Sequence, residues 1–529
     1  MKPENKPVQL NLINIVIPAL TALNVAACGR GSSTSADSVA SDSVACSGTP
    51  ETEWLPDTVF PSASVVKCNV EIIDKNIDGR PESIKDLYTA TPGSFTFRNG
   101  SLRDANFGGT LKTAPTSFEI DWQFDTDEDY TPTKYGIWGG GTGWTGQPLL
   151  VNWPDSCLQR FADAGHPASA TEVIIGSLSG RVYFIDFATG KPSREAINTG
   201  NPIKGTPSLD PTLNGNLYVG QGVTSGFDVS ALVLDLSTMS VSHSFGPDPK
   251  APRRWHAYDS SPVRVGQFLF RPGENGTLYK YMIGKGTLSL HSALRYTING
   301  YAPGIEASMA IYRNYGYIAD NAGNVICINI SDLQPVWRYK LPDDTDATPV
   351  VTEEADGTYI YTGCEVEHEG ITEAVFVKLN ALTGDLVWSN RIPAQRKDIG
   401  EKHFDGGFYA TALPGRGNCS GLIFSNCVQN TDCSNGSLFA FDRANGKTVY
   451  STPLRYYAWS SPVGFTDPDG KFYIITADCA GNIYLINGID GKIIHRASVG
   501  ANFESSPVVS GNSFVVGSRG KTIYKITLK

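Results

Sequence analysis

The sequence predicts an all-β protein, an eight-bladed β-propeller whose last blade is closed by an N-terminal strand. Two observations predict this fold: a turn-rich composition, and a repeated pattern of short strands. The chain has 529 residues, of which 55 are glycine, and only 18% of its residues are charged. Sequences that combine many turn residues with few candidate helices are typical of all-β folds.

The charge balance excludes one class of partner. The formal net charge is -10 at pH 7, whereas proteins that bind the phosphate backbone of nucleic acids present a basic face. The sequence therefore predicts no nucleic-acid partner.

Residues 1–28 have the pattern of a secretion signal. Lys2 and Lys6 precede an apolar stretch that ends in the letters VAAC, at Cys28. A short apolar segment that follows basic residues and ends in small residues is typical of a signal peptide. The last four residues resemble the lipobox of bacterial lipoproteins, in which the peptide is cleaved before a cysteine that receives lipid. We expect lipidation at Cys28; the alternative is an ordinary signal peptide with an incidental cysteine.

Residues 29–93 are expected to form a flexible tether and an N-terminal extension. The stretch GRGSSTSADSVASDSVACSG, which follows Cys28, has the small and polar composition of a solvated linker. No later apolar run approaches the ~20 residues that a membrane-spanning helix needs.

Ten cysteines are present, and export would permit disulfides. If Cys28 is lipidated, nine remain, so at least one is unpaired. Cys46 with Cys68, and Cys427 with Cys433, are pairs suggested by closeness in sequence alone. No C-x-x-C spacing occurs and the 7 histidines are scattered, so no metal site is predicted.

Two phrases recur along residues 94–529, which form the predicted propeller domain. The first is a small-small-proline strand start, with complete or degenerate copies near 146, 205, 260, 307, 347, 410, 460 and 505. The second phrase, as in GRVYFIDFATGK, has alternating apolar residues, an Asp or Asn, and a turn that ends in Gly. Glycine adopts the positive φ that closes a tight hairpin. Each unit therefore reads as an antiparallel sheet of four strands, and eight such units suit a propeller.

The last unit predicts how the ring closes. The chain ends after three strands of this unit, which leaves an exposed sheet edge that natural proteins rarely tolerate. The segment SFEIDWQFDT, residues 117–126, is an isolated strand that resembles the outer strand of the other units. We expect this segment to complete the last blade; the alternative is an open solenoid with a frayed end.

The repeated phrase resembles the pyrroloquinoline-quinone (PQQ) type repeat, over roughly residues 94 to 529. The stretch FTFRNGSLRDANFGG, which opens the domain, also resembles a segment of such repeat proteins. The resemblance implies a propeller fold that two groups share. One group comprises quinoprotein dehydrogenases. The other comprises non-catalytic propeller lipoproteins, resembling the factor of the outer-membrane β-barrel assembly machinery.

The sequence departs from the dehydrogenases in several places. Those enzymes typically carry two adjacent cysteines beside the quinone, and no Cys-Cys occurs here. The tryptophan of the repeat survives at Trp122, Trp337 and Trp388, but it is replaced by Tyr450 and Ile494 elsewhere. The calcium ligands of the enzymes do not map onto defined positions, so no catalytic or metal-binding residue is assigned.

The residue before each strand start is expected near the mouth of the central channel. These residues and their loop neighbours give the candidate ligand-binding set: Lys204, Trp255, His256, Asp259, Glu306, Asp346, Tyr409, Trp459 and Glu504. Converging carboxylates repel one another, so they would hold protons, bind a cation or accept hydrogen bonds from a ligand. Aromatic faces beside acids suit a sugar or a peptide. The alternative is that these side chains cap main-chain groups or are solvated.

The sequence thus favours a lipid-anchored protein of the bacterial cell envelope, expected at the outer membrane, with its periplasmic or surface face left open. Its expected role is a non-catalytic binding or scaffolding module without a cofactor. The expected partners are envelope proteins or an extracellular glycan, besides the membrane that holds the anchor. The alternatives are a PQQ-dependent dehydrogenase, which would need PQQ with calcium, and a glycan-binding surface propeller.

Overall fold

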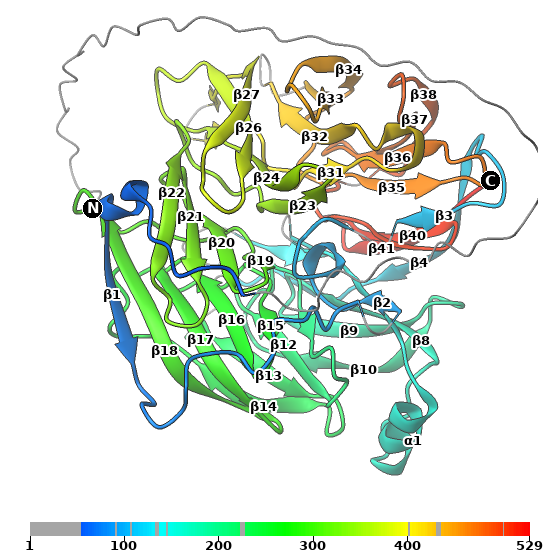
Figure 1. The fold of residues 1–529 in the computed structure, drawn as a ribbon. Helices are drawn as coiled ribbons and strands as arrows, with labels where there is room; N and C mark the ends of the chain where they lie inside the picture. Colours follow the sequence, from blue (N-terminus) through cyan, green and yellow to red (C-terminus); the bar gives the residue numbers. More distant parts are fainter. Residues whose placement is uncertain are drawn as a thin grey trace, which may run out of the picture. The chain divides into compact units, whose positions relative to one another are not determined.

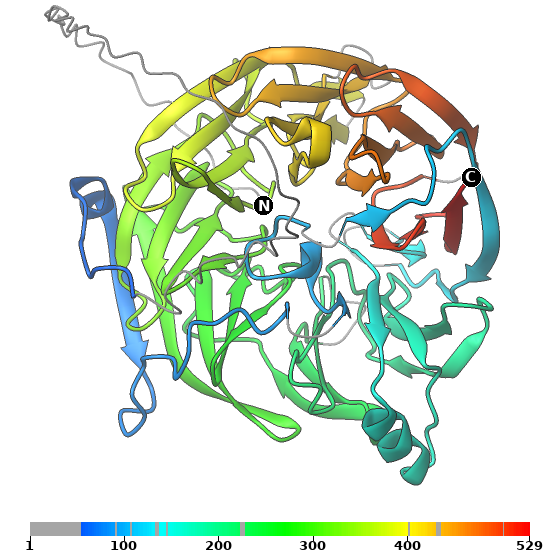
Figure 2. The same cartoon turned by 45° about the vertical axis from the view of Figure 1, so that its right-hand side comes forward.

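Among the described residues, eight sheets have four or more strands, and they surround a common centre (Figures 1 and 2). The computed structural model describes residues 54–89, 92–105, 108–132, 137–143, 146–222, 228–399, 402–429, 435–500 and 502–529. The predicted lipidation site Cys28 lies outside the described residues. No helix among the described residues is long and apolar enough to cross a membrane.

The sheets are numbered as blades 1 to 8 in chain order. Blade 1 comprises β7 (Leu149–Asn152), β8 (Thr171–Gly176), β9 (Arg181–Asp186) and β10 (Pro192–Asn198), and blade 2 comprises β11 (Ser208–Leu209), β12 (Asn216–Gly220), β13 (Ala231–Asp235) and β14 (Ser240–Phe245). Blade 3 comprises β15 (Val263–Val265), β16 (Phe268–Gly273), β17 (Thr277–Gly284) and β18 (Thr287–Ile298), and blade 4 comprises β19 (Ala310–Tyr312), β20 (Tyr315–Ala319), β21 (Asn324–Asn329) and β22 (Pro335–Lys340). Blade 5 comprises β23 (Val350–Glu354), β24 (Gly357–Gly363), β26 (Glu373–Asn380) and β27 (Leu386–Pro393), and blade 6 comprises β31 (Leu413–Pro414), β32 (Leu422–Val428), β33 (Gly436–Asp442) and β34 (Thr448–Leu454). Blade 7 comprises β35 (Val463–Thr466), β36 (Phe472–Ala477), β37 (Asn482–Asn487) and β38 (Ile493–Ser498), and blade 8 comprises β39 (Val508–Ser510), β40 (Ser513–Gly517), β41 (Thr522–Leu528) and β4 (Phe118–Asp125). A nine-residue helix, α1 (Asp155–Asp163), lies between β7 and β8 of blade 1.

The eight predicted strand starts coincide with the inner strands of the blades. Each inner strand begins three residues after the first residue of the small-small-proline phrase, as β15 does at Val263. The hydroxyl groups of the phrase join neighbouring blades. The Ser261 amide donates to Ser308 Oγ at 2.8 Å, and the Ser308 amide donates to Thr348 Oγ1 at 3.0 Å. The phrase therefore contributes to contacts between blades as well as starting strands.

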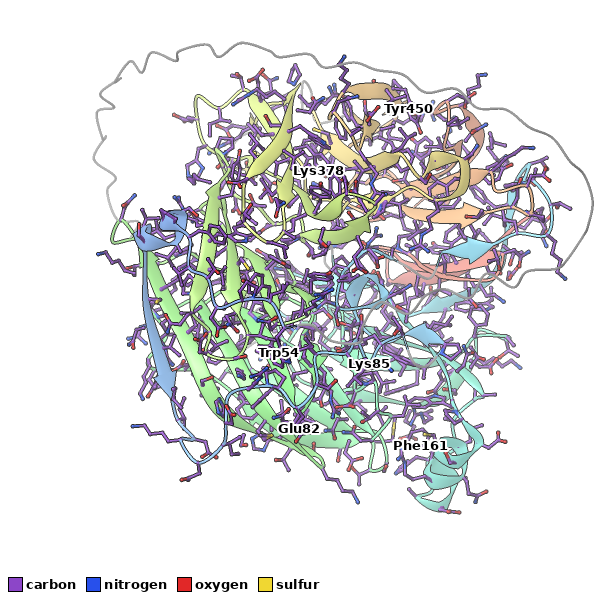
Figure 3. All side chains as sticks on the ribbon, viewed as in Figure 1. Trp54, Glu82, Lys85, Phe161, Lys378 and Tyr450 are labelled. Carbon is purple, nitrogen blue, oxygen red and sulfur yellow. The ribbon has the colours of Figure 1, made fainter. Side chains whose placement is uncertain are left out.

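The tryptophan and the glycine turn of the repeat form a second contact between blades. Trp388 in β27 lies against Gly446 of the next blade, where a Cβ atom would be 2.5 Å from the indole ring. The indole Nε1 donates to the Arg443 carbonyl at 2.9 Å. The same packing pairs Trp337 with Gly384, Trp122 with Gly190, and Tyr450 (labelled in Figure 3) with Gly491. The glycine is required here because it has a positive φ and no side chain.

Blade 8 is built from both ends of the described chain. β4 pairs antiparallel with β41, from Phe118 opposite Leu528 to Asp125 opposite Thr522. Trp122 of β4 packs against blade 1, where its Nε1 donates to the Phe187 carbonyl at 3.0 Å. The N-terminal segment predicted to cover the C-terminal sheet edge does so.

Residues 54–89 belong to the expected N-terminal extension; β1 lies on the outside of the ring, and the chain after it runs inward to residues 94–105 at the centre (Figures 1 and 2). β1 (Val66–Ile72) pairs antiparallel with β18, which makes the sheet of blade 3 five-stranded (Figure 1). Trp54 packs against the core beneath this segment and stacks under Arg80, whose guanidinium carbon is 3.9 Å from the ring centroid (Figure 3). The sequence did not predict this strand, because the segment lacks the repeat pattern.

Cys68 and Cys427, for which the sequence suggests disulfide partners, are free cysteines among the described residues. Their proposed partners, Cys46 and Cys433, lie outside the described residues. Cys427 is fully buried in the sheet core of blade 6, whereas Cys68 is exposed on β1.

A segment of residues 94–105, here called the central segment, lies at the centre of the ring (Figure 2). Its main chain is hydrogen-bonded to the inner strands of three blades. The Phe95 carbonyl accepts from Leu209 at 2.7 Å, the Ser101 carbonyl from Ile311 at 2.7 Å, and the Leu102 carbonyl from Val351 at 2.9 Å. This segment therefore occupies part of the central channel.

Candidate functional site

The strand starts of blades 2 to 4 bring three predicted residues together. Lys204, Asp259 and Glu306 precede β11, β15 and β19. The Lys204 ammonium contacts the Asp259 carboxylate and lies 3.3 Å from Glu306 Oε1. Glu274, which follows β16, completes an acidic triad with Asp259 and Glu306 in which one oxygen from each lies within 4.8 Å of the others. We call these three residues the first acidic triad.

Asp344, Asp346 and Glu365 form the second acidic triad, at the start of blade 5. One oxygen from each again lies within 4.8 Å of the others. Asp346 was predicted, whereas Asp344 and Glu365 were not. Glu365 Oε1 and Asp344 Oδ1 are buried and have no hydrogen-bond partner in the part of the chain that the structure describes.

The missed acids Glu274 and Glu365 occupy related positions in their blades. Glu274 directly follows β16, and Glu365 comes two residues after the end of β24. An antiparallel hairpin returns the end of its second strand to the level at which its first strand begins. The residues after each second strand could therefore have been added to the candidate set from the repeat alone.

Burial raises the pKa of every carboxyl group in the two triads for which a shift is resolved. It is the largest cause for Glu274, Asp344, Asp346 and Glu365, and neighbouring carboxylates raise the pKa of each of them further. Burial and Asp259 raise the pKa of Glu306 to about 7, against the opposing effect of Lys204. The charged groups that raise the pKa values of the second triad most are all carboxylates. This site therefore favours protons or a bound cation over free negative charge.

This electrostatic arrangement predicts how stability depends on pH. The pKa of Glu306 is about 7 in the folded protein, against an ordinary value of 4.5, so its stabilising contribution is present below 4.5 and is lost as the pH rises through 7. We expect the free energy of unfolding to fall, by on the order of 1 kcal/mol per pH unit, between about pH 5 and about pH 7. Glu306→Gln should flatten this slope in urea unfolding curves. Equal slopes for the two proteins would contradict the assignment.

Aromatic side chains lie beside the second triad. The rings of Tyr409 and Trp459 stack with centroids 5.1 Å apart, and Tyr457 packs against Trp459 at 5.4 Å. Together with Glu306 and Asp346, the stacked pair helps to line a cavity of about 20 Å³. This cavity has room for a water molecule or a single ion.

The structure places the remaining predicted residues differently. Trp255 Nε1 donates to Glu274 Oε2 at 2.5 Å, so Trp255 is part of the first triad's surroundings. Glu504 accepts from Asn502 Nδ2 at 2.8 Å and lies 3.8 Å from Arg519 Nε. His256 belongs to neither triad, and burial lowers its pKa.

Two arginines of the central segment hold the inner ends of four blades. The guanidinium of Arg98 donates to the Pro462 and Ala412 carbonyls at 2.7 and 2.9 Å. The guanidinium of Arg103 donates to the Met309 and Ser261 carbonyls at 2.9 and 3.0 Å. Both side chains are buried, and burial lowers the pKa of Arg98 to about 9 and that of Arg103 to about 10. Sequence reasoning missed them because their acceptors are main-chain carbonyls that are distant in sequence.

The second triad has the oxygen donors that a hard cation prefers, since calcium binds six to eight oxygen ligands. Asp344, Asp346 and Glu365 could each supply one oxygen. PQQ fits the described residues less well, because the quinone itself carries several carboxylates. The Lys204 ammonium belongs to the first triad's surroundings, where it already contacts Asp259 and Glu306. Arg98 and Arg103 are likewise engaged with main-chain carbonyls.

Comparison with known proteins identifies the fold. No sequence-family model matches the chain, and no curated protein sequence matches it. A quinohemoprotein alcohol dehydrogenase from Pseudomonas putida aligns with a TM-score of 0.58 at 11% identity, over 85% of this chain and 83% of that enzyme. The quinohemoprotein alcohol dehydrogenase from Comamonas testosteroni aligns with a TM-score of 0.57 at 12% identity, over 82% and 80%.

BamB from Moraxella catarrhalis aligns with a TM-score of 0.47 at 16% identity, over 72% of this chain and 98% of that protein. The sequence identities are all low, so these similarities concern the architecture and not the site. The chain is an eight-bladed β-propeller, the fold that the two quinohemoprotein alcohol dehydrogenases share.

Proposed function

We propose that this chain is a non-catalytic binding or scaffolding propeller of the bacterial cell envelope, anchored in the outer membrane by a lipid on Cys28. Its partners would be envelope proteins that dock on the loops of the ring. A rigid ring with wide loop faces suits this role, because recognition then needs no cofactor and little rearrangement.

The central segment is the observation that carries this proposal. The side chains of Arg98 and Arg103 donate hydrogen bonds to main-chain carbonyls of blades 3, 4, 6 and 7. The main chain of the segment is hydrogen-bonded to blades 2, 4 and 5. The chain thus uses its own residues to join the blades at the channel. Those cationic groups would otherwise be the natural anchors for an anionic cofactor.

A quinoprotein dehydrogenase is the second candidate, and one observation favours it. Stacking rings at Tyr409 and Trp459 lie beside a carboxylate triad that could hold a cation, and two structurally similar proteins are quinohemoprotein alcohol dehydrogenases. Dye reduction by the purified protein, with alcohols or sugars and added PQQ and calcium, separates the two candidates. We expect no reduction above the level of a heat-denatured control. Quinone-dependent turnover that Asp346→Asn abolishes would establish the enzyme instead.

The anchor gives a separate prediction. Cys28→Ser removes the thiol that would receive the lipid, and we expect the variant to move from the membrane to the soluble envelope fraction. Cell fractionation with an immunoblot measures this distribution. Cys68→Ser is the matched control, because Cys68 is a free, exposed cysteine on β1. If Cys28→Ser stays with the membrane as the control does, the anchor lies elsewhere.

A further inference from the structure

A cleft of about 390 Å³ opens between blades 3 and 4, on the side of the loop that carries the second triad. Its walls come from the end of β18, the outer strands of blade 4 and the loop after Glu365. The residues that line this cleft include Tyr301, Arg338, Lys340, Asp344 and His368. None of them belongs to the central segment, and only Asp344 is shared with the second triad.

Arg338 is held in the cleft by a relay of hydrogen bonds. Buried Asp320 accepts from Asn324 Nδ2 at 2.8 and 2.9 Å, and Asn324 Oδ1 in turn accepts from Arg338 Nε at 2.8 Å. The terminal nitrogens of Arg338 have no acceptor among the described residues. Burial lowers the pKa of Arg338, and the Asp320 carboxylate opposes this shift. A guanidinium fixed through Nε, with its outer edge free, is suited to a carboxylate or phosphate.

Two further donors face the same cleft. The Lys340 ammonium donates to the Ala322 and Leu341 carbonyls, each at 2.6 Å, which leaves one of its three N–H groups over. His368 Nδ1 lies 2.5 Å from Asp343 Oδ1, and its side chain is 67% exposed. Asp343 is otherwise saturated, because it accepts from the amides of Glu367 and His368 at 2.8 and 3.0 Å. The Asp343 carboxylate beside Lys340 and His368 is therefore already engaged by donors of the protein itself.

The rim of the cleft is aromatic and apolar. Tyr301 is 52% exposed, and Ile298 and Pro342 also line the cleft. Exposed aromatic faces beside polar groups suit the apolar face of a sugar ring. Asp344 also lines the cleft, and burial together with the nearby carboxylates Glu367 and Glu306 raises its pKa.

We infer that this cleft binds an acidic sugar, with the sugar carboxylate held by Arg338 and Lys340 and the ring placed against Tyr301. The acidic sugar would be free or at the end of an acidic glycan. This site is separate from the channel and does not depend on whether the propeller is a scaffold or an enzyme.

Isothermal titration calorimetry of the mature chain with glucuronate, glucose and inorganic phosphate tests the inference. We expect glucuronate to bind and glucose to bind at least about tenfold more weakly, since glucose lacks the charge-assisted hydrogen bonds. Arg338→Gln and Tyr301→Ala should each weaken glucuronate binding about tenfold. A longer acidic oligosaccharide with a terminal uronate should bind at least as well as the free sugar if the glycan is the source.

The matched controls are Arg391→Gln and Tyr456→Ala, which change exposed side chains outside the cleft. Both should bind glucuronate like the unaltered chain, and unchanged melting temperatures should show that all four variants are folded. Should Arg338→Gln fail to fold, Tyr301→Ala alone decides, because its side chain is half exposed. Equal binding of phosphate and glucuronate with no effect of Tyr301→Ala would overturn the sugar assignment, as would the absence of glucuronate binding.

Discussion

Removal of residues 1–126 is expected to abolish cooperative unfolding of the propeller. The deletion takes away β4, which covers the edge of β41, and Trp122, which joins blade 8 to blade 1. It also removes the central segment, with the hydrogen bonds of Arg98 and Arg103. An exposed sheet edge and four unlinked blades should give a broad, non-cooperative transition and aggregation. Urea unfolding followed by tryptophan fluorescence and circular dichroism measures this.

Removal of residues 1–90 is the control for that deletion. It takes away β1 and its packing on blade 3, but it keeps the central segment and β4. We expect a lower midpoint with a single cooperative transition. If the two truncated proteins unfold alike, β4 does not close the ring.

Arg103→Ala is expected to destabilise the fold by about 3–5 kcal/mol, because it leaves several buried carbonyls without a donor. Arg103 is fully buried, and besides the Met309 and Ser261 carbonyls it donates to the Phe97 carbonyl at 2.8 Å and to Thr96 Oγ1 at 2.9 Å. Chemical denaturation gives the free energy of unfolding.

Two variants make this measurement specific. Arg391→Ala removes an arginine whose side chain is 62% exposed, and it should change the free energy of unfolding by less than about 0.5 kcal/mol. Arg103→Lys keeps the charge but loses the forked donors of the guanidinium, so its loss of free energy of unfolding should lie between those of Arg103→Ala and Arg391→Ala. If Arg103→Ala lowers the free energy of unfolding no more than Arg391→Ala does, the central segment does not link the blades.

The blades could be predicted from sequence because their signals are local. Alternating apolar residues set each strand, and a glycine turn such as Gly446 closes each hairpin, so eight copies in register fix the number of blades and the inner strand starts. Closure was predictable as well, since three strands at the C-terminus leave one edge to be covered.

The central segment and part of the site could not be predicted in this way. The acceptors of Arg98 lie 364 and 314 residues away, and they are carbonyl groups that carry no sequence signature. Asp344 joins the second triad through the course of one loop, which the repeat does not specify. β1 adds to blade 3 without any repeat pattern of its own, so its place depends on long-range packing.

The melting temperature of the protein with PQQ and calcium separates a non-catalytic propeller from a quinoprotein enzyme. A ligand at a hundredfold excess over its Kd stabilises the folded state by about 2.7 kcal/mol. Calcium alone is the reference, because the second triad could hold the ion without the quinone. We expect PQQ to add nothing to the effect of calcium on the melting temperature. A further rise of the expected size, lost in Asp346→Asn while that variant stays folded, would contradict a non-catalytic propeller.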